Sequence, residues 1–198
     1  YFRDDAFNGR NALSGTKLPM SQKQYGGSLG GPIAKDRTFF FANAEQRLLD
    51  QTGLATISDA NVAIVNARLS AVDYPGSPVV TGIYPNPVHS SNVLGRVDHQ
   101  FNGADQLSVR YALYDVVSDN SRGAGNLNAP SGSAALDSRD QSIAISNVWT
   151  ISPNTVSETR VQIAHGDLNA PSTDQIGPQV TITGVATFGT FSSSPTRR

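Results

Sequence analysis

Apolar and polar residues alternate along several stretches of this chain, and this period of two constrains the fold more than any other feature. In 93–101 and again in 107–113 the odd positions are mostly apolar, whereas the even positions are mostly polar or charged. Successive side chains of a strand point to opposite faces, so each stretch is typical of a strand with one apolar face. The Asn-Gly dipeptide in the connection 102–105 predicts a tight hairpin turn.

Two further hairpins follow the same design. Residues 25–33 alternate in the same way, and the polar turn 34–37 leads into a second strand that starts with three phenylalanines. In the third unit, isoleucine and tryptophan alternate with small polar residues through 142–151, and the "PNT" turn follows. The returning strand 156–166 has valine and isoleucine on one face and charged residues on the other. We therefore expect an all-β fold built of antiparallel hairpins.

The connections between these hairpins are long, in contrast to the tight turns within them. They run through residues 50–92 and 118–141, and both are rich in Gly, Ser, Asn and Pro. Tight turns at one end and long loops at the other, joining strands of alternating character, are typical of an outer-membrane β-barrel. A soluble β-sandwich has turns of mixed length at both ends. Both folds stay open on this pattern alone.

The first long loop contains a helical signal. Ser58 or Asp59 can cap a helix, and Val62, Val65, Leu69 and Val72 recur at helical spacing before "YPGSP" ends the pattern. We expect a short loop helix that packs on the mouth of a barrel.

The glycine cluster in "QYGGSLGGPIAKDR" does not fit a nucleotide site. A Rossmann fingerprint needs Gly-x-Gly-x-x-Gly before a helix, and a P-loop ends in Gly-Lys-Ser/Thr, whereas a hairpin follows here. Glycine within a strand instead permits close backbone approach, curvature or a bulge.

Charge and composition exclude several classes of function. Fifteen basic and sixteen acidic residues leave a net charge of -1, which gives no basic surface for nucleic acid. There is no cysteine, hence no disulfide framework and no thiolate metal site. The chain opens "YFRDD" without methionine or a signal sequence, so we expect a piece of a longer chain. The uncharged stretch 175–196 is too rich in Gly, Ser, Thr and Pro to be a spanning helix.

The sequence contains no complete catalytic, cofactor-binding or metal-binding motif. "SGTK" at 14–17 and "SDN" at 118–120 match two elements of a serine β-lactamase, but the third, Lys-Thr-Gly, is missing. His89, His99 and His165 have no metal-ligand spacing. We therefore expect that the chain is not an enzyme and needs no cofactor.

Five charged residues form the candidate site on the polar strand faces: Arg96, Asp98, Arg110, Glu158 and Arg160. In a soluble fold these side chains would be solvated surface, whereas in a barrel they would face the lumen and pair with one another or with a plug. Tyr111, Tyr114, Trp149 and the run 39–41 would then belong to an aromatic girdle at the membrane interface.

Four blocks carry a resemblance to a known family. "YFRDDAFNGRNAL", "QYGGSLGGPIAKDRTFFFANAEQ", "LGRVDHQFNGADQLSVRYALYD" and "VWTISPNTVSETRVQIAHG" resemble, in this order, the early barrel region of Oar-like TonB-dependent outer-membrane receptors. The resemblance covers the chain to about Gly189. It implies a plugged barrel of about 22 strands that binds or takes up a bulky ligand, energised through TonB.

On that resemblance, residues 1–198 are one partial barrel domain of a receptor, without the plug domain and the remaining strands. The partners implied are outer-membrane lipid, a plug domain of the same full-length chain, the TonB complex and a bulky ligand whose identity is unknown. The location implied is the outer membrane, and the loops 50–92 and 118–141 would carry most of the ligand contact. The alternative is a soluble or surface-attached β-sandwich that binds carbohydrate or protein with the same loops.

Overall fold

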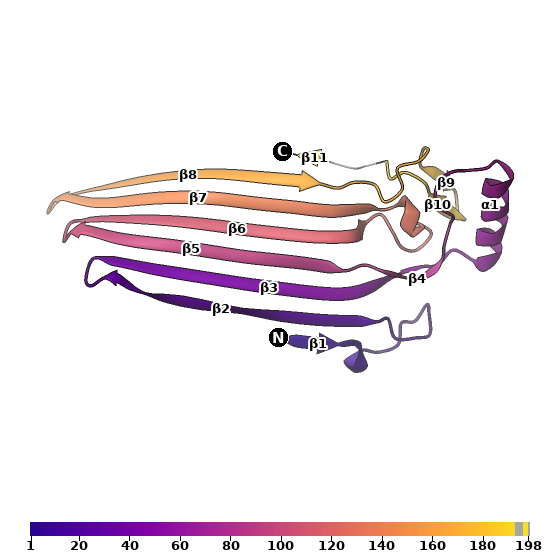
Figure 1. Ribbon diagram of the computed structural model, residues 1–198, viewed down its shortest axis with the longest axis horizontal. Helices are drawn as coiled ribbons and strands as arrows, with labels where there is room; N and C mark the ends of the chain where they lie inside the picture. Colours follow the sequence, from indigo (N-terminus) through magenta and orange to yellow (C-terminus); the bar gives the residue numbers. More distant parts are fainter. Residues whose placement is uncertain (193–195, 198) are drawn as a thin grey trace.

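Six long antiparallel strands lie side by side in one curved sheet of the computed structural model, which describes residues 1–192 and 196–197 (Figure 1). Their bounds are β2 (Met20–Ala34), β3 (Thr38–Ala55), β5 (Val88–Asn102), β6 (Asp105–Arg122), β7 (Ala134–Ser152) and β8 (Thr155–Asn169). Short strands pair with the two outermost long strands: β1 (Phe2–Asp4) with β2, and β11 (Thr196–Arg197) with β8. The expected all-β fold of antiparallel hairpins is confirmed.

The remaining elements lie at one end of the sheet (Figure 1). There, β4 (Gly82–Pro85) pairs with the last residues of β3, and β9 (Val180–Ile182) pairs with β10 (Ala186–Phe188) in a separate small sheet. The expected loop helix is α1 (Asp59–Ala71), capped by the Ser58 side chain, which accepts a hydrogen bond from the Asn61 amide. Two single 3-10 turns complete the list, at Asp5–Phe7 and Pro130–Gly132.

All three predicted hairpin turns are present, and they lie together at the opposite end of the sheet (Figure 1). The turns join Ala34 to Thr38, Asn102 to Asp105, and Ser152 to Thr155. In the second, the Asn102 Oδ1 atom accepts a hydrogen bond of 2.8 Å from the Ala104 amide, as the Asn-Gly signal predicts.

The long connections are shorter than the sequence indicated. They run from 56 to 87 and from 123 to 133, because the strands continue beyond the expected boundaries at 50, 92, 118 and 141. In these extensions the period-two signal fades, since polar residues take both faces. The backbone ladder nevertheless goes on, supported by cross-strand pairs such as Arg139 Nε with Asp115 Oδ1 at 2.7 Å.

Strand register gives the sheet two faces of different chemistry. One row of directly opposed residues on the apolar face is Leu29, Ala42, Gly95, Tyr111, Ile143 and Ile163. The next row is Gly31, Phe40, Val97, Val109, Ile145 and Val161. No charged residue interrupts these two rows, so the alternation of each strand adds up to a continuous apolar surface.

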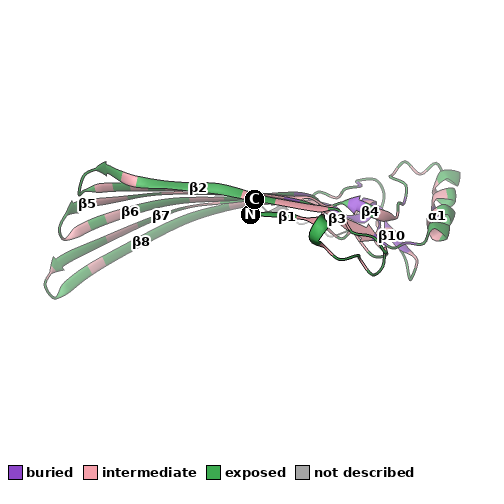
Figure 2. Ribbon diagram, turned by 90° about the horizontal axis from the view of Figure 1, so that it is seen from below, coloured by how far each residue is buried: buried purple, intermediate pink, exposed green. Residues whose placement is uncertain are grey.

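Neither face of the sheet is covered by another layer within the described residues (Figure 2). On the apolar face, Ile163 is 71% exposed and Leu29 is 63% exposed. A β-sandwich would bury such a face against a second sheet about 10 Å away. The uncovered apolar face is the main structural argument against the sandwich that the sequence left open.

The glycine cluster of β2 is explained by the phenylalanines of β3. Gly30 and Gly31 stand directly opposite Phe41 and Phe40, one pair on each face of the hairpin. A Cβ atom built on Gly30 would lie 2.9 Å from the Phe40 carbonyl oxygen and 3.3 Å from the Phe41 ring. The expected role of glycine in close backbone approach is confirmed at this position, and an aromatic ring fills the space that a side chain would take.

Replacing these glycines tests the argument. Gly30→Ala and Gly26→Ala should each destabilise the folded protein by about 1–3 kcal/mol, because the added methyl group meets the backbone of β3. Gly27→Ala is the matched control, since nothing lies within 4 Å of its Cβ position. Urea unfolding of the full-length protein in lipid bilayers measures the difference; equal effects at all three positions would contradict the proposed close approach.

Candidate functional site

The five predicted charged residues lie on one face of the sheet, opposite the apolar face. Arg96 stands directly across from Arg110, and Asp98 stands across from Ser108. On the neighbouring strands, Arg160 stands across from Ser146, and Glu158 across from Val148. The register of β5 to β8 therefore brings all five together on what we call the polar face.

Two of the three arginines are paired with a carboxylate on their own strand. Arg96 donates to Asp98 Oδ1 from Nε at 3.0 Å and from Nη2 at 2.8 Å, and Arg160 Nε donates to Glu158 Oε1 at 2.7 Å. Arg110 has no hydrogen bond or ion pair to any described residue. The three cations thus exceed the two carboxylates in the middle of the polar face.

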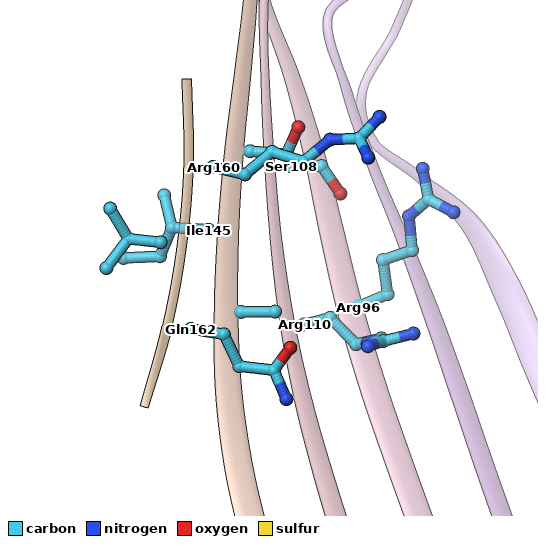
Figure 3. A pocket seen from close by; sticks show the side chains of 9 residues that line it. Arg96, Ser108, Arg110, Ile145, Arg160 and Gln162 are labelled. Atoms are coloured by element: carbon cyan, nitrogen blue, oxygen red, sulfur yellow. The ribbon is translucent and has the colours of Figure 1, made fainter. Parts of the chain in front are cut away.

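The arginines line a depression of about 560 Å³ (Figure 3). In Figure 3 the side chains of Arg96, Arg110 and Arg160 lie on one side of the strands, while Ile145 points to the other side. Small residues, Ala144 and Ser146 among them, also line the depression, and the side chains of Arg96 and Arg160 remain accessible. The depression offers several hydrogen-bond donors to an acceptor group.

Three of the aromatic residues assigned to a girdle lie on the polar face instead. Phe39 stands opposite Asp98, and Phe41 stands opposite Arg96, whereas Tyr114 stands opposite Asn92 and Asp140. The assignment of these three was wrong, because successive residues of a strand point to opposite faces: this divides the run 39–41, and it puts Tyr114 on the face opposite to Tyr111. The alternation of the strand sequence contained this signal.

The other aromatic residues of that group lie on the apolar face. They are Phe40, Tyr111 and Trp149, and Trp149 is close to the hairpin turn that joins β7 to β8. On β5 the apolar-face positions run from Val93 to Phe101, with His99 as the one polar side chain among them. The stretch has about nine residues, which is the length that crosses a hydrocarbon core as a tilted strand. On the loop side the stretch ends at a polar row that contains Asp115, Arg139 and Asp167.

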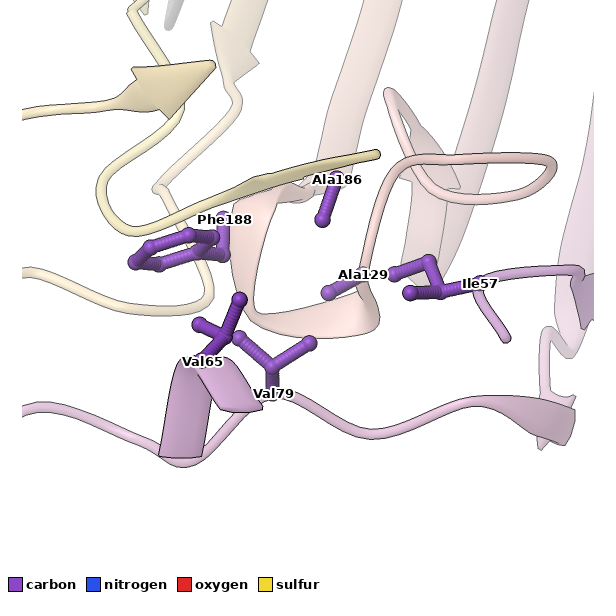
Figure 4. Packing of buried hydrophobic residues seen from close by; sticks show 6 residues of the cluster. All are labelled: Ile57, Val65, Val79, Ala129, Ala186 and Phe188. Atoms are coloured by element: carbon purple, nitrogen blue, oxygen red, sulfur yellow. The ribbon is translucent and has the colours of Figure 1, made fainter. Parts of the chain in front are cut away.

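The loop end of the sheet contains the compact apolar core of the described chain (Figure 4). Its members are Ile57, Val65, Val79, Ala129, Ala186 and Phe188. They come from three segments, 56–87, 123–133 and 170–191, which we call the head. The expected loop helix is present, but α1 packs on other segments of the head, β10 among them, and not on the six long strands as expected for a barrel mouth.

Hydrogen bonds join the three segments of the head. The Thr56 amide donates to the Asn126 carbonyl oxygen at 2.7 Å, and the Ala129 amide donates to Thr187 at 2.9 Å. Ser133 is fully buried, and its hydroxyl contacts Thr173 Oγ1 at 2.9 Å. The loops are therefore a folded unit rather than extended connections.

A buried carboxylate ties the first loop to the C-terminal segment. Asp174 is 5% exposed, and its two oxygens accept hydrogen bonds from the Ser77 and Ile176 amides at 2.9 and 3.0 Å. Tyr74 donates to the Ile176 carbonyl oxygen at 2.9 Å. Burial and the nearby Asp174 carboxylate raise the pKa of Tyr74, so its neutral, donating form is favoured in the folded head.

Asp174→Asn should loosen the head. The amide nitrogen replaces one carboxylate oxygen and faces a backbone donor, so we expect a loss of about 1–3 kcal/mol of local stability. Limited proteolysis of the full-length protein should show faster cleavage in 56–87. Asp73→Asn is the control at a nearby exposed aspartate, and equal cleavage of the two variants would contradict the role of Asp174.

The described residues contain no group of three or more histidine, aspartate or glutamate side chains that could hold a metal ion. His89 pairs with Asp50 at 2.9 Å, and His165 with Asp167 at 3.2 Å, both as exposed pairs. In the β-lactamase-like pattern, the Lys17 ammonium donates to the Ala6 carbonyl oxygen. Along the described chain, no helix is long and apolar enough to span a membrane.

The sequence matches the model of a known domain family, described as outer membrane beta barrel domain, over residues 1–93 and 55–197. The chain belongs to this outer-membrane β-barrel family. A search of curated proteins and a search of solved structures each find no match. The family places the chain in the outer membrane and accounts for an open, partial barrel sheet with one uncovered apolar face.

Outer-membrane β-barrels have an apolar outer band and a polar interior. We therefore expect the apolar face of this barrel domain to contact lipid and the polar face, with Arg96, Asp98, Arg110, Glu158 and Arg160, to line the lumen. Sequence analysis grouped these charges but did not identify Phe39 and Phe41 as their neighbours.

Adjacent residues of β7 test which face contacts lipid. Ile143→Arg should cost about 2–4 kcal/mol, because it puts a cation on the lipid side near the middle of the apolar band. Ser142→Arg, one residue away on the polar face, should cost much less. Denaturant unfolding of the full-length protein in bilayers measures both, and a larger loss for Ser142→Arg would reverse the assignment of the faces.

Proposed function

We propose that this barrel domain is part of an Oar-like TonB-dependent receptor that binds and takes up a bulky ligand. The four sequence blocks that resemble this family include all three hairpins of the sheet. The barrel fold and the outer-membrane location are consistent with that function. Residues 1–198 would supply one sector of the barrel wall.

The observation that carries the proposal is the folded head at the loop end of a sheet whose polar face is uncovered. Long connections packed around their own apolar core give a preorganised surface, which reduces the entropy lost when a ligand binds. The ligand contacts expected for 50–92 and 118–141 would then fall on the folded parts 56–87 and 123–133, together with 170–191. A large ligand suits this arrangement, because the three segments present a broad surface.

The partners follow from the same proposal. Outer-membrane lipid would cover the apolar face, and a plug domain of the full-length chain would fill the lumen. Ligand binding would shift the state of the plug, and TonB would pull on it to open a path. The function needs no enzymatic step and no cofactor in this domain.

Direct binding to TonB tests the proposal. The full-length protein in detergent should bind the purified periplasmic domain of TonB from the same organism saturably in biolayer interferometry. A porin of the same membrane is the control and should show no binding. Absence of binding by the full-length protein would remove the TonB-dependent function, while leaving the barrel fold untouched.

A further inference from the structure

We propose that the middle of the polar face is a docking surface for an acidic segment of protein inside the barrel. The surface consists of Arg96, Arg110, Arg160, Phe39 and Phe41. The inference rests on the proposed function, in which a plug domain fills the lumen, and it adds the chemistry of the contact: a carboxylate with an apolar side chain beside it.

The charge of the surface favours an anionic partner. Arg96 and Arg110 are directly opposed across β5 and β6, and like charges in such a pair destabilise a sheet. Asp98 neutralises Arg96, and Glu158 neutralises Arg160, but no described residue neutralises Arg110. A carboxylate from outside the sheet would satisfy Arg110 and remove the repulsion.

The aromatic residues favour a protein segment over a water-filled lumen. Phe39 and Phe41 are 45% and 42% exposed on the same face, directly across from Asp98 and Arg96. Contact between apolar rings and water is unfavourable in free energy, whereas an apolar side chain packed on the rings would remove their surface from water. A free small anion would satisfy Arg110 and leave both rings exposed.

The position of the surface fits an internal partner. Val97 and Val109, in the middle of the apolar rows, occupy the opposite face of the sheet next to Arg96 and Arg110. The small side chains of Ala144 and Ser146 line the depression at the arginines, so a side chain from a facing segment has room to reach Arg110. The docking surface lies closer to the hairpin turns than to the head. In a closed barrel a partner would therefore reach this surface from inside the lumen.

Photo-cross-linking in the full-length protein identifies the partner. A benzoyl-phenylalanine probe replaces Phe39, and the same probe at Phe40, on the opposite face, is the control. We expect the probe at 39 to cross-link a plug segment of the same polypeptide that contains Asp or Glu, and the probe at 40 to cross-link lipid. Cross-links from 39 to lipid alone, or to no protein segment, would overturn the proposal.

Hydrogen exchange then measures the ion pair. Arg110→Gln should lower the protection of the cross-linked segment about tenfold, the effect of losing one charge-assisted hydrogen bond, and Arg110→Lys should lose less. Arg47→Gln is the control, because Arg47 lies on the same face away from the surface and also has no ion-pair partner among the described residues. Unchanged protection in Arg110→Gln would overturn the proposal, since relief of the Arg96 repulsion alone would not loosen the segment.

Two further outcomes separate the alternatives. If inorganic phosphate raises the melting temperature of the wild type but not of Arg110→Gln, and Phe39 cross-links no protein, the occupant is a free anion and the proposal is wrong. TonB binding without a cross-link at 39 would overturn this inference alone. A cross-linked plug segment in a protein that does not bind TonB would instead overturn the proposed function alone.

Discussion

The continuous backbone ladder from β2 to β8 is the constraint on which the rest of the structure depends. A strand that crosses hydrocarbon must pair its amide and carbonyl groups with neighbouring strands, because no water is there to replace them. The register between Met20 and Asn169 meets that requirement with three tight turns, three small irregularities next to them and a fourth between Ser118 and Arg122 at the loop end. Once the ladder is set, the period of two decides which side chains contact lipid.

The division of burial in this chain follows from the ladder. A soluble domain gains most of its stability from side chains removed from water, whereas the two faces of this sheet remain open in the isolated sector. Among the described residues, most buried apolar side chains lie in the head, where Val79 and Ala129 are almost completely covered. The exceptions are Leu49, Ala55 and Ala134, at the loop ends of β3 and β7. The sheet depends on its membrane and its lumen for contacts, and the head supplies its own.

Much of the fold could be predicted from the sequence, because it depends on local signals. The alternation of apolar and polar residues predicted the hairpins, and Asn-Gly and the other short polar segments between the strands predicted the turns. Ser58 and the valines that follow it predicted α1. Strand ends were missed because polar pairs such as Asp115 and Arg139 extend the ladder without an apolar pattern. To assign Phe39 and Phe41 to the polar face, the alternation of the strand must be followed residue by residue through the aromatic run.

The head could not be predicted, because its core combines residues that are distant in sequence. Ala129 and Ala186 look like ordinary loop residues, and nothing near Asp174 signals that its partner is Ser77. These contacts depend on how the three hairpins position the loop ends of their strands relative to one another. The charged site was easier: Arg96, Arg110 and Arg160 could be grouped by strand alternation, although their alignment in neighbouring rows needed the register.

The origin of the head in three distant segments has a consequence for how the protein is built. The Tyr74 hydroxyl donates to the carbonyl oxygen of Ile176, 102 positions further along the chain, and contacts so distant in sequence form more slowly than the local hairpins between them. We therefore expect the head to close late in assembly, after β8 has joined the sheet. On that expectation, an error in any of the three hairpins would keep the segments of the head apart and leave its apolar side chains exposed to proteases.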